Sequence, residues 1–315
     1  MTEPITFPGW ILKSIEENQD QLNPKSLGFF KKFVELFPDF DKSFLSIPAT
    51  LEVGVLTSLD PSEIQKSLGI SSPLEFIILN TAELMHFHFV YQMRELGQTL
   101  LDSLHQGKFF VAAIQSRAML EVVCTNYYAF VGAEAKMKKS SAFLLEAART
   151  RSEKEKSRLL KDYYAGIHEV FSGMFDSNRK SSINWSDYLK DKFGTQGHSD
   201  DQPKKINVLT AIEEVGKKSK LPLRETYHIL SEFVHPNVGS KMLIINTKKQ
   251  RHPLMDTLKM GDNVNNSEAA LFYFDHLAEG SYYSWTLALS LFHRSQDFIS
   301  KLSQLCGLER SQFLH

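Results

Sequence analysis

The sequence predicts an all-α protein built as a bundle of long helices. Apolar residues recur at helical spacing over several long runs between residues 72 and 305. Only residues 241–246 combine the short apolar run and β-branched side chains that are typical of a strand. With 315 residues, 42% of them hydrophobic, and a net charge of −1, the chain has the composition of an ordinary globular protein. We therefore expect a helical bundle, a small N-terminal helical subdomain and one short β element near 241–246.

The N-terminal subdomain is expected to span residues 1–72, and the main helical domain residues 73–315. The first segment contains short apolar runs separated by helix breakers. Pro24 is predicted to begin a helix that continues through Phe37, with Pro38 ending it because proline disrupts an α-helical hydrogen bond.

Further helices are predicted over residues 72–104, 108–130, 140–174, 206–218, 222–235 and 267–305. Between Phe109 and Phe130 the only charged residues are Arg117 and Glu121, which are four residues apart. A helix that is apolar on nearly every face is expected to be central. We expect these two side chains to form a partly buried ion pair.

The chain is expected to be cytoplasmic and to have no membrane partner. No apolar run approaches the roughly 20 residues of a membrane span, and the first residues lack an export signal. Cys124 and Cys306 are the only cysteines, and we expect both to be free thiols.

The candidate functional site is a polar stripe in the helix predicted over residues 222–235. At about 100° per residue, Leu223, Tyr227, Leu230 and Val234 form an apolar stripe. A second stripe beside it contains Arg224, His228, Ser231 and His235, and Asn237 follows shortly after it. Histidine titrates near neutral pH and arginine binds phosphate in a bidentate manner, so this row suits acid–base chemistry on an anion. The alternative is a structural seam, in which Ser231 bonds to its own helix and His235 interacts with the helix dipole.

The charge distribution makes RNA a candidate partner. Residues 217–252 contain eight Lys or Arg against two Glu, a net charge of +6, and this window encloses the polar stripe. A mixed, solvated helix surface would produce the same pattern.

The sequence patterns that could indicate a metal or cofactor site are less specific than the polar stripe. Glu83-x2-His86, Glu225-x2-His228 and Glu232-x2-His235 have the spacing used in di-iron bundles, which leaves a di-iron oxidase as a third possibility. A cation at Arg224 would repel a metal, and the two later pairs lie on one helix. No glycine-rich phosphate loop, cysteine cluster or nucleophile elbow is present. We expect no cofactor and no metal.

Two segments resemble a known pattern. Residues 116–121 (Ser-Arg-Ala-Met-Leu-Glu) and 227–236 (Tyr-His-Ile-Leu-Ser-Glu-Phe-Val-His-Pro) are similar to an uncharacterised family of prokaryotic helical proteins. That family has an Arg-x3-Glu helix and a Tyr-x3-Ser-x3-His-Pro helix. More distantly, the chain resembles the HEPN superfamily of α-helical proteins, many of which are metal-independent ribonucleases of toxin and antiphage systems.

The HEPN resemblance implies roles for three residues of the stripe, and His228 would line the same site. His235 would act as base or acid on the ribose 2′-hydroxyl, Arg224 would hold the phosphate and Ser231 would orient them. Arg117, Glu121, Tyr227 and Asn237 would support the site, which in HEPN proteins typically lies between two subunits of a homodimer. The spacing differs from HEPN nucleases, because fewer residues separate Arg224 from His228, and more separate Arg224 from His235.

The first hypothesis is therefore a HEPN-like effector that binds or cleaves RNA. The alternative is a non-enzymatic helical interaction protein, in which the stripe and the Arg117–Glu121 pair form one structural polar network.

Overall fold

The computed structural model describes most of the helical part of the chain. It covers residues 24–47, 73–106, 108–152, 207–234, 245–247, 258–260 and 268–305, and nine further residues, 154–156, 158, 159, 162, 163, 167 and 170. The parts of the predicted N-terminal subdomain before residue 24 and after residue 47, and its predicted boundary at residue 72, lie outside these described residues.

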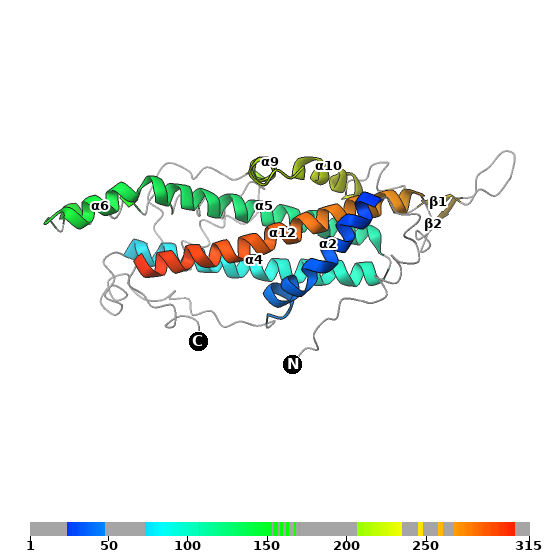
Figure 1. The fold of residues 1–315 in the computed structure, drawn as a ribbon, viewed down its shortest axis with the longest axis horizontal. Helices are drawn as coiled ribbons and strands as arrows, with labels where there is room; N and C mark the ends of the chain where they lie inside the picture. Colours follow the sequence, from blue (N-terminus) through cyan, green and yellow to red (C-terminus); the bar gives the residue numbers. More distant parts are fainter. Residues whose placement is uncertain are drawn as a thin grey trace, which may run out of the picture. The chain divides into compact units, whose positions relative to one another are not determined.

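The prediction of an all-α protein is confirmed, since helices dominate the described residues (Figure 1). The helical elements are α2 (Pro24–Phe40), the π-helix η1 (Asp41–Leu45), α4 (Pro73–His105), α5 (Phe109–Lys139), α6 (Ser141–Arg149), α9 (Val208–Ser219), α10 (Leu223–Val234) and α12 (Glu268–Leu305). α5 continues well beyond its predicted end near Phe130. Its extension ends in Lys136, Lys138 and Lys139, and positive charge in the last turn stabilises the carbonyl end of a helix.

The prediction that Pro38 ends a helix is wrong. α2 continues through Pro38 to Phe40, and η1 follows directly. The reason is tertiary packing: the Phe40 ring stacks on Trp285 at 4.0 Å between centroids, with an interplanar angle of 2°. Phe40 and Phe44 are both fully buried. This burial outweighs the local cost of a proline near the end of a helix.

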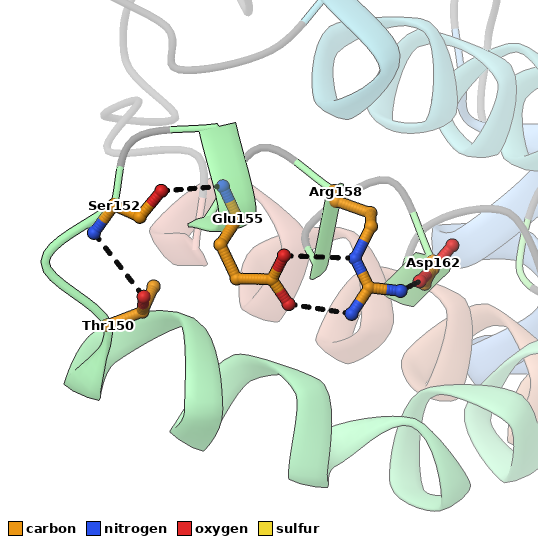
Figure 2. Close-up of polar contacts among 5 residues, drawn as sticks. All are labelled: Thr150, Ser152, Glu155, Arg158 and Asp162. Carbon is orange, nitrogen blue, oxygen red and sulfur yellow. Dashed lines mark hydrogen bonds and ion pairs between the residues drawn. The ribbon is translucent and has the colours of Figure 1, made fainter.

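The single helix predicted over residues 140–174 is also wrong, because α6 ends at Arg149. Thr150 is extended, and the Ser152 hydroxyl accepts a hydrogen bond from the Glu155 N–H at 3.4 Å (Figure 2). Ser-x2-Glu is a helix-initiating pattern, so a new helical segment starts here. The described residues from Lys154 onward are again helical. Arg158 then pairs with Glu155 at 2.6 Å and with Asp162 at 3.6 Å.

Two short strands form an antiparallel pair. β1 (Ile245–Thr247) pairs with β2 (Leu258–Met260), with Asn246 opposite Lys259. Residues 241–244, the first part of the predicted β element, lie outside the described residues.

The chain divides into two compact units, each assembled from three sequence segments. The first unit comprises Met1–Ile47, Phe89–Cys124 and Ile212–Ser290, and the second comprises Pro48–His88, Thr125–Ala211 and Leu291–His315. In the first unit, an aromatic cluster joins α2 and η1 to α12 and α4. Its centre is Trp285, which packs against Phe33 at 3.9 Å and against Phe40, while Phe44 contacts Phe89 edge-on at 5.7 Å.

The core of the second unit joins α5 to the last part of α12. Phe130 and Phe298 are buried and contact edge-to-face at 5.8 Å. Nearby in sequence, Arg294 binds Glu134 through two hydrogen bonds, of 2.9 and 2.5 Å. A buried hydrogen bond of 2.8 Å also links His86 Nδ1 to the Ser295 hydroxyl.

Among the described helices, none combines the length and the apolar character that crossing a bilayer requires.

Candidate functional site

Helix α10 is held in place by one strongly apolar face. Its buried residues are Leu223, Thr226, Tyr227, Leu230 and Phe233. Three members of the predicted apolar stripe are therefore buried, whereas Val234 is only half-buried. Phe233 and Thr226 are also buried, although they were not part of the predicted apolar stripe. The buried arc of α10 is therefore wider than a single i, i+4 row.

Close approach at Gly280 packs α10 and α5 against α12. A Cβ atom at Gly280 would lie 2.8 Å from Leu230 Cδ1 and 2.9 Å from the Ser116 hydroxyl oxygen. The neighbouring Ser281 hydroxyl donates to Ser116 Oγ at 3.3 Å. Any larger residue would force Leu230 or Ser116 to shift, so the glycine allows both site helices to approach the same part of α12 closely.

A tight turn sets the angle between α9 and α10. Lys220 adopts a left-handed conformation with φ 59°. The Leu221 N–H donates to the Gly216 carbonyl at 3.2 Å, which is the bond expected of a Schellman helix end. A Cβ atom at Gly216 would lie 3.1 Å from the Leu221 carbonyl oxygen. The turn is therefore stereochemically constrained, and it brings the carboxylates of α9 close to the first turn of α10.

Arg224 and His228 lie on the exposed side of α10. The Arg224 side chain is 64% exposed, and its Nε–H donates to His228 Nε2 at 3.4 Å. To accept this bond the imidazole must be neutral, with its proton on Nδ1. Arg224 also forms an ion pair with Glu213 of α9 through Nη1 and Oε1. The structure thus places a guanidinium and an imidazole side by side in contact with solvent.

Ser231 bonds back to its own helix. Its hydroxyl donates to the Tyr227 carbonyl at 2.7 Å, as the structural alternative predicted. This bond leaves the oxygen's lone pairs as acceptors, and the residue is half-buried. His235 and Asn237 lie outside the described residues.

Arg117, Glu121 and Tyr227 form a cluster that joins α5 to α10. The predicted ion pair is confirmed, with Arg117 Nη2 and Glu121 Oε1 2.9 Å apart and side chains 15% and 24% exposed. The Tyr227 hydroxyl accepts from Arg117 Nη2 at 2.8 Å and donates to Glu121 Oε1 at 2.8 Å. The guanidinium also lies over the tyrosine ring, 5.0 Å from its centroid. Three side chains therefore close one polar triangle between the two helices.

Burial raises the pKa of Tyr227 above its ordinary value, because the phenolate would lose its hydration. The hydrogen bond from Arg117 acts in the opposite direction, and the neighbouring Glu121 raises the pKa further. The hydroxyl is therefore neutral at physiological pH. It serves as a fixed donor and acceptor and not as a base.

The structure places the predicted site residues of α10 in different surroundings. Arg224 and His228 face solvent, whereas Ser231 bonds inward and Tyr227, predicted as a supporting residue, contacts the α5 pair. Glu213 was not among the predicted site residues, because it contacts Arg224 only through the turn at Lys220. No helical spacing signals this contact, since the two residues are eleven apart and lie on different helices.

The charge around Arg224 is balanced in the described part of this region. Over α9, α10 and their turn, Lys217, Lys218, Lys220 and Arg224 are matched by Glu213, Glu214, Glu225 and Glu232. Lys217 pairs with Glu214 at 2.8 Å. The remaining cations of the window with net charge +6 (Lys241, Lys248, Lys249 and Arg251) lie outside the described residues.

The described residues contain no group of three or more His, Cys, Asp or Glu able to hold a metal ion. His86 is instead bonded to Ser295, and Glu225 and Glu232 are exposed. Cys124 is a buried free thiol, and burial raises its pKa, so it is suited neither to metal binding nor to nucleophilic attack.

Comparisons of the chain with protein-family models, curated proteins and solved structures return no match.

Proposed function

We propose that the chain is a HEPN-like, metal-independent effector that binds RNA and cleaves it at the exposed side of α10, within a prokaryotic stress or antiphage response. The observation that supports this proposal is the adjacency of Arg224 and His228, 3.4 Å apart and open to solvent. A phosphate group can reach both side chains, and a guanidinium that binds phosphate beside an imidazole that transfers protons suits phosphodiester transfer without a metal.

In this proposal Arg224 leaves His228 Nε2 and binds a non-bridging phosphate oxygen, and the freed Nε2 of His228 accepts the proton of the ribose 2′-hydroxyl. The 2′-oxygen then attacks phosphorus, the bond from phosphorus to the 5′-oxygen breaks, and the leaving oxygen takes a proton from His235. The products are a 2′,3′-cyclic phosphate and a 5′-hydroxyl. Ser231 and Asn237 orient these groups, and a second subunit of a homodimer completes the cleft.

The triangle of Arg117, Glu121 and Tyr227 is assigned a supporting role. It contacts α10 one residue before His228, so it fixes the helix from which the reactive side chains project. A rigid scaffold keeps catalytic groups within the narrow range of productive positions.

The test compares wild type with Arg224→Ala, His228→Ala and His235→Ala on single-stranded RNA in the presence of a chelator. Arg224→Ala should weaken binding, and each histidine variant should slow cleavage by about 10²-fold or more. Arg158→Ala is the matched control, because Arg158 is also an exposed arginine paired with a carboxylate (Figure 2). Full activity in all three site variants would exclude these residues from catalysis.

The second candidate function is a non-enzymatic helical interaction protein. It is favoured by a specific observation: the Tyr227 and Ser231 hydroxyls make their hydrogen bonds internally. Under this hypothesis Tyr227→Phe and His235→Ala lower the melting temperature, while RNA binding and cleavage are absent from every variant, including wild type.

A further inference from the structure

We infer that Glu213 competes with RNA phosphate for Arg224, so that α9 contains an electrostatic brake on the RNA-binding surface of α10. The inference rests on the proposed RNA binding and assigns a regulatory role to a residue outside that site. Carboxylate and phosphate oxygens both accept hydrogen bonds from a guanidinium. Glu213 and an RNA phosphate therefore cannot bind the same N–H groups of Arg224 at the same time.

The contact is built by the fold and does not depend on a long flexible reach. Glu213 and Arg224 are eleven residues apart and meet across the constrained turn at Lys220. The Leu221 N–H bond to the Gly216 carbonyl and the close approach of Gly216 to Leu221 hold that turn. The folded α9 and α10 therefore hold the Arg224 and Glu213 side chains within reach of each other.

The contact is also weak enough to be displaced. The Arg224 side chain is 64% exposed and that of Glu213 is 32% exposed, so water and salt screen the pair. Exposed ion pairs of this kind change an equilibrium by about two- to fivefold. A polyanion that contacts several cations at once can therefore replace Glu213.

A second acidic residue of α9 also forms an ion pair with a neighbouring cation. Glu214 pairs with Lys217 at 2.8 Å, and this bond lowers the pKa of Glu214 while it raises that of Lys217. Glu213 and Glu214 of α9 thus each form an ion pair with one of the four cations around the turn. Lys218 and Lys220 are exposed and provide the initial attraction for a polyanion.

The experiment measures binding of a fluorescently labelled single-stranded RNA to the full chain by anisotropy at fixed ionic strength. The proteins are wild type, Glu213→Gln, Arg224→Ala and the Glu213→Gln/Arg224→Ala double variant. Glu155→Gln is the matched control, since it removes one carboxylate from another exposed arginine pair (Figure 2). Circular dichroism melting establishes that each variant is folded.

Glu213→Gln should tighten RNA binding about two- to fivefold. This increase in affinity should disappear in the Arg224→Ala background, and Glu155→Gln should bind RNA as tightly as wild type does. If Arg224→Ala weakens binding but Glu213→Gln equals wild type, the brake is refuted and the proposed function stands. Two other results would also refute the brake: an equal increase in RNA affinity in Glu155→Gln, or an increase in Glu213→Gln that persists in the Arg224→Ala background. Either result would show that the affinity follows net charge alone. If neither wild type nor Glu213→Gln binds RNA, both proposals fail.

Discussion

Replacing Tyr227 by phenylalanine tests whether the triangle on α5 and α10 stabilises the site. The change removes a single hydroxyl, which accepts from Arg117 and donates to Glu121 at 2.8 Å in each case. The ring stays, and with it the contact with the guanidinium 5.0 Å from the ring centroid. The variant therefore isolates two hydrogen bonds to charged groups.

The expected loss follows from the contacts that remain. A hydrogen bond to a charged group contributes about 1.5–3 kcal/mol. Arg117 and Glu121 remain 2.9 Å apart and partly exposed, so they still satisfy one another and reach water. Because these contacts remain, the substitution removes less stability than two full hydrogen bonds would provide. We expect the free energy of unfolding to fall by about 1–3 kcal/mol in total. In a protein of this size this corresponds to a fall in melting temperature of about 2–6 °C.

A matched control lies elsewhere in the chain. Tyr127 accepts one long hydrogen bond, of 3.3 Å, from Arg294, and Arg294 is already bound to Glu134 by two stronger ones. Tyr127→Phe should therefore cost less than about 1 kcal/mol. The two variants share the same chemical change and differ only in how much the hydroxyl contributes.

Urea denaturation and thermal melting of both variants measure the difference. The reasoning fails if Tyr227→Phe is as stable as wild type, or if Tyr127→Phe is the more destabilised of the two. A double-mutant cycle of Tyr227→Phe with Glu121→Gln should show coupling of about 0.5 kcal/mol or more, as expected for residues in direct contact.

Three further predictions concern the same region. Gly280→Ala should destabilise the protein by about 1–3 kcal/mol in urea denaturation, because the new methyl group would lie 2.8 Å from Leu230 Cδ1. Lys220→Gly should raise stability by up to about 1 kcal/mol, since it relieves the left-handed φ of 59°, and Lys220→Val should lower it. The third concerns alkaline pH: burial raises the pKa of Tyr227 and Tyr283 above 10. The stability that their neutral hydroxyls provide is complete below pH 10 and is lost as the pH rises through the raised values. Melting temperature should therefore fall above pH 10, with a shallower slope in Tyr227→Phe.

Hydrophobic periodicity was enough to predict most helices, because α4, α9 and α10 each alternate buried and more exposed positions at helical spacing. The errors arose where tertiary contacts or caps outweighed local signals. Pro38 does not end α2, since Phe40 beyond it stacks on the distant Trp285. The break after Arg149 depends on Ser152 and Glu155, a capping pattern inside a strongly charged run.

The candidate site was predictable in its composition but not in its arrangement. The i, i+4 spacing of Arg117 and Glu121 predicted their ion pair. No pattern within one helix could show that Tyr227 completes it, because the contact spans 110 residues. Likewise, Glu213 approaches Arg224 only through the geometry of the turn at Lys220.

The hydroxyl of Tyr227 and the polar side chains of Arg224 and His228 lie on different sides of α10, which separates stability from activity. Tyr227 points to α5, whereas Arg224 and His228, three residues before it and one after, are exposed. A variant of the inner side lowers the stability of the helix that positions the reactive side chains, so its main effect on activity comes through the folded fraction. A variant of the outer side changes contacts with a ligand while leaving the inner hydrogen bonds intact. Under the RNA hypothesis, His228→Ala should slow cleavage by about 10²-fold or more at an unchanged melting temperature. Tyr227→Phe should instead retain cleavage at temperatures well below its lowered melting point.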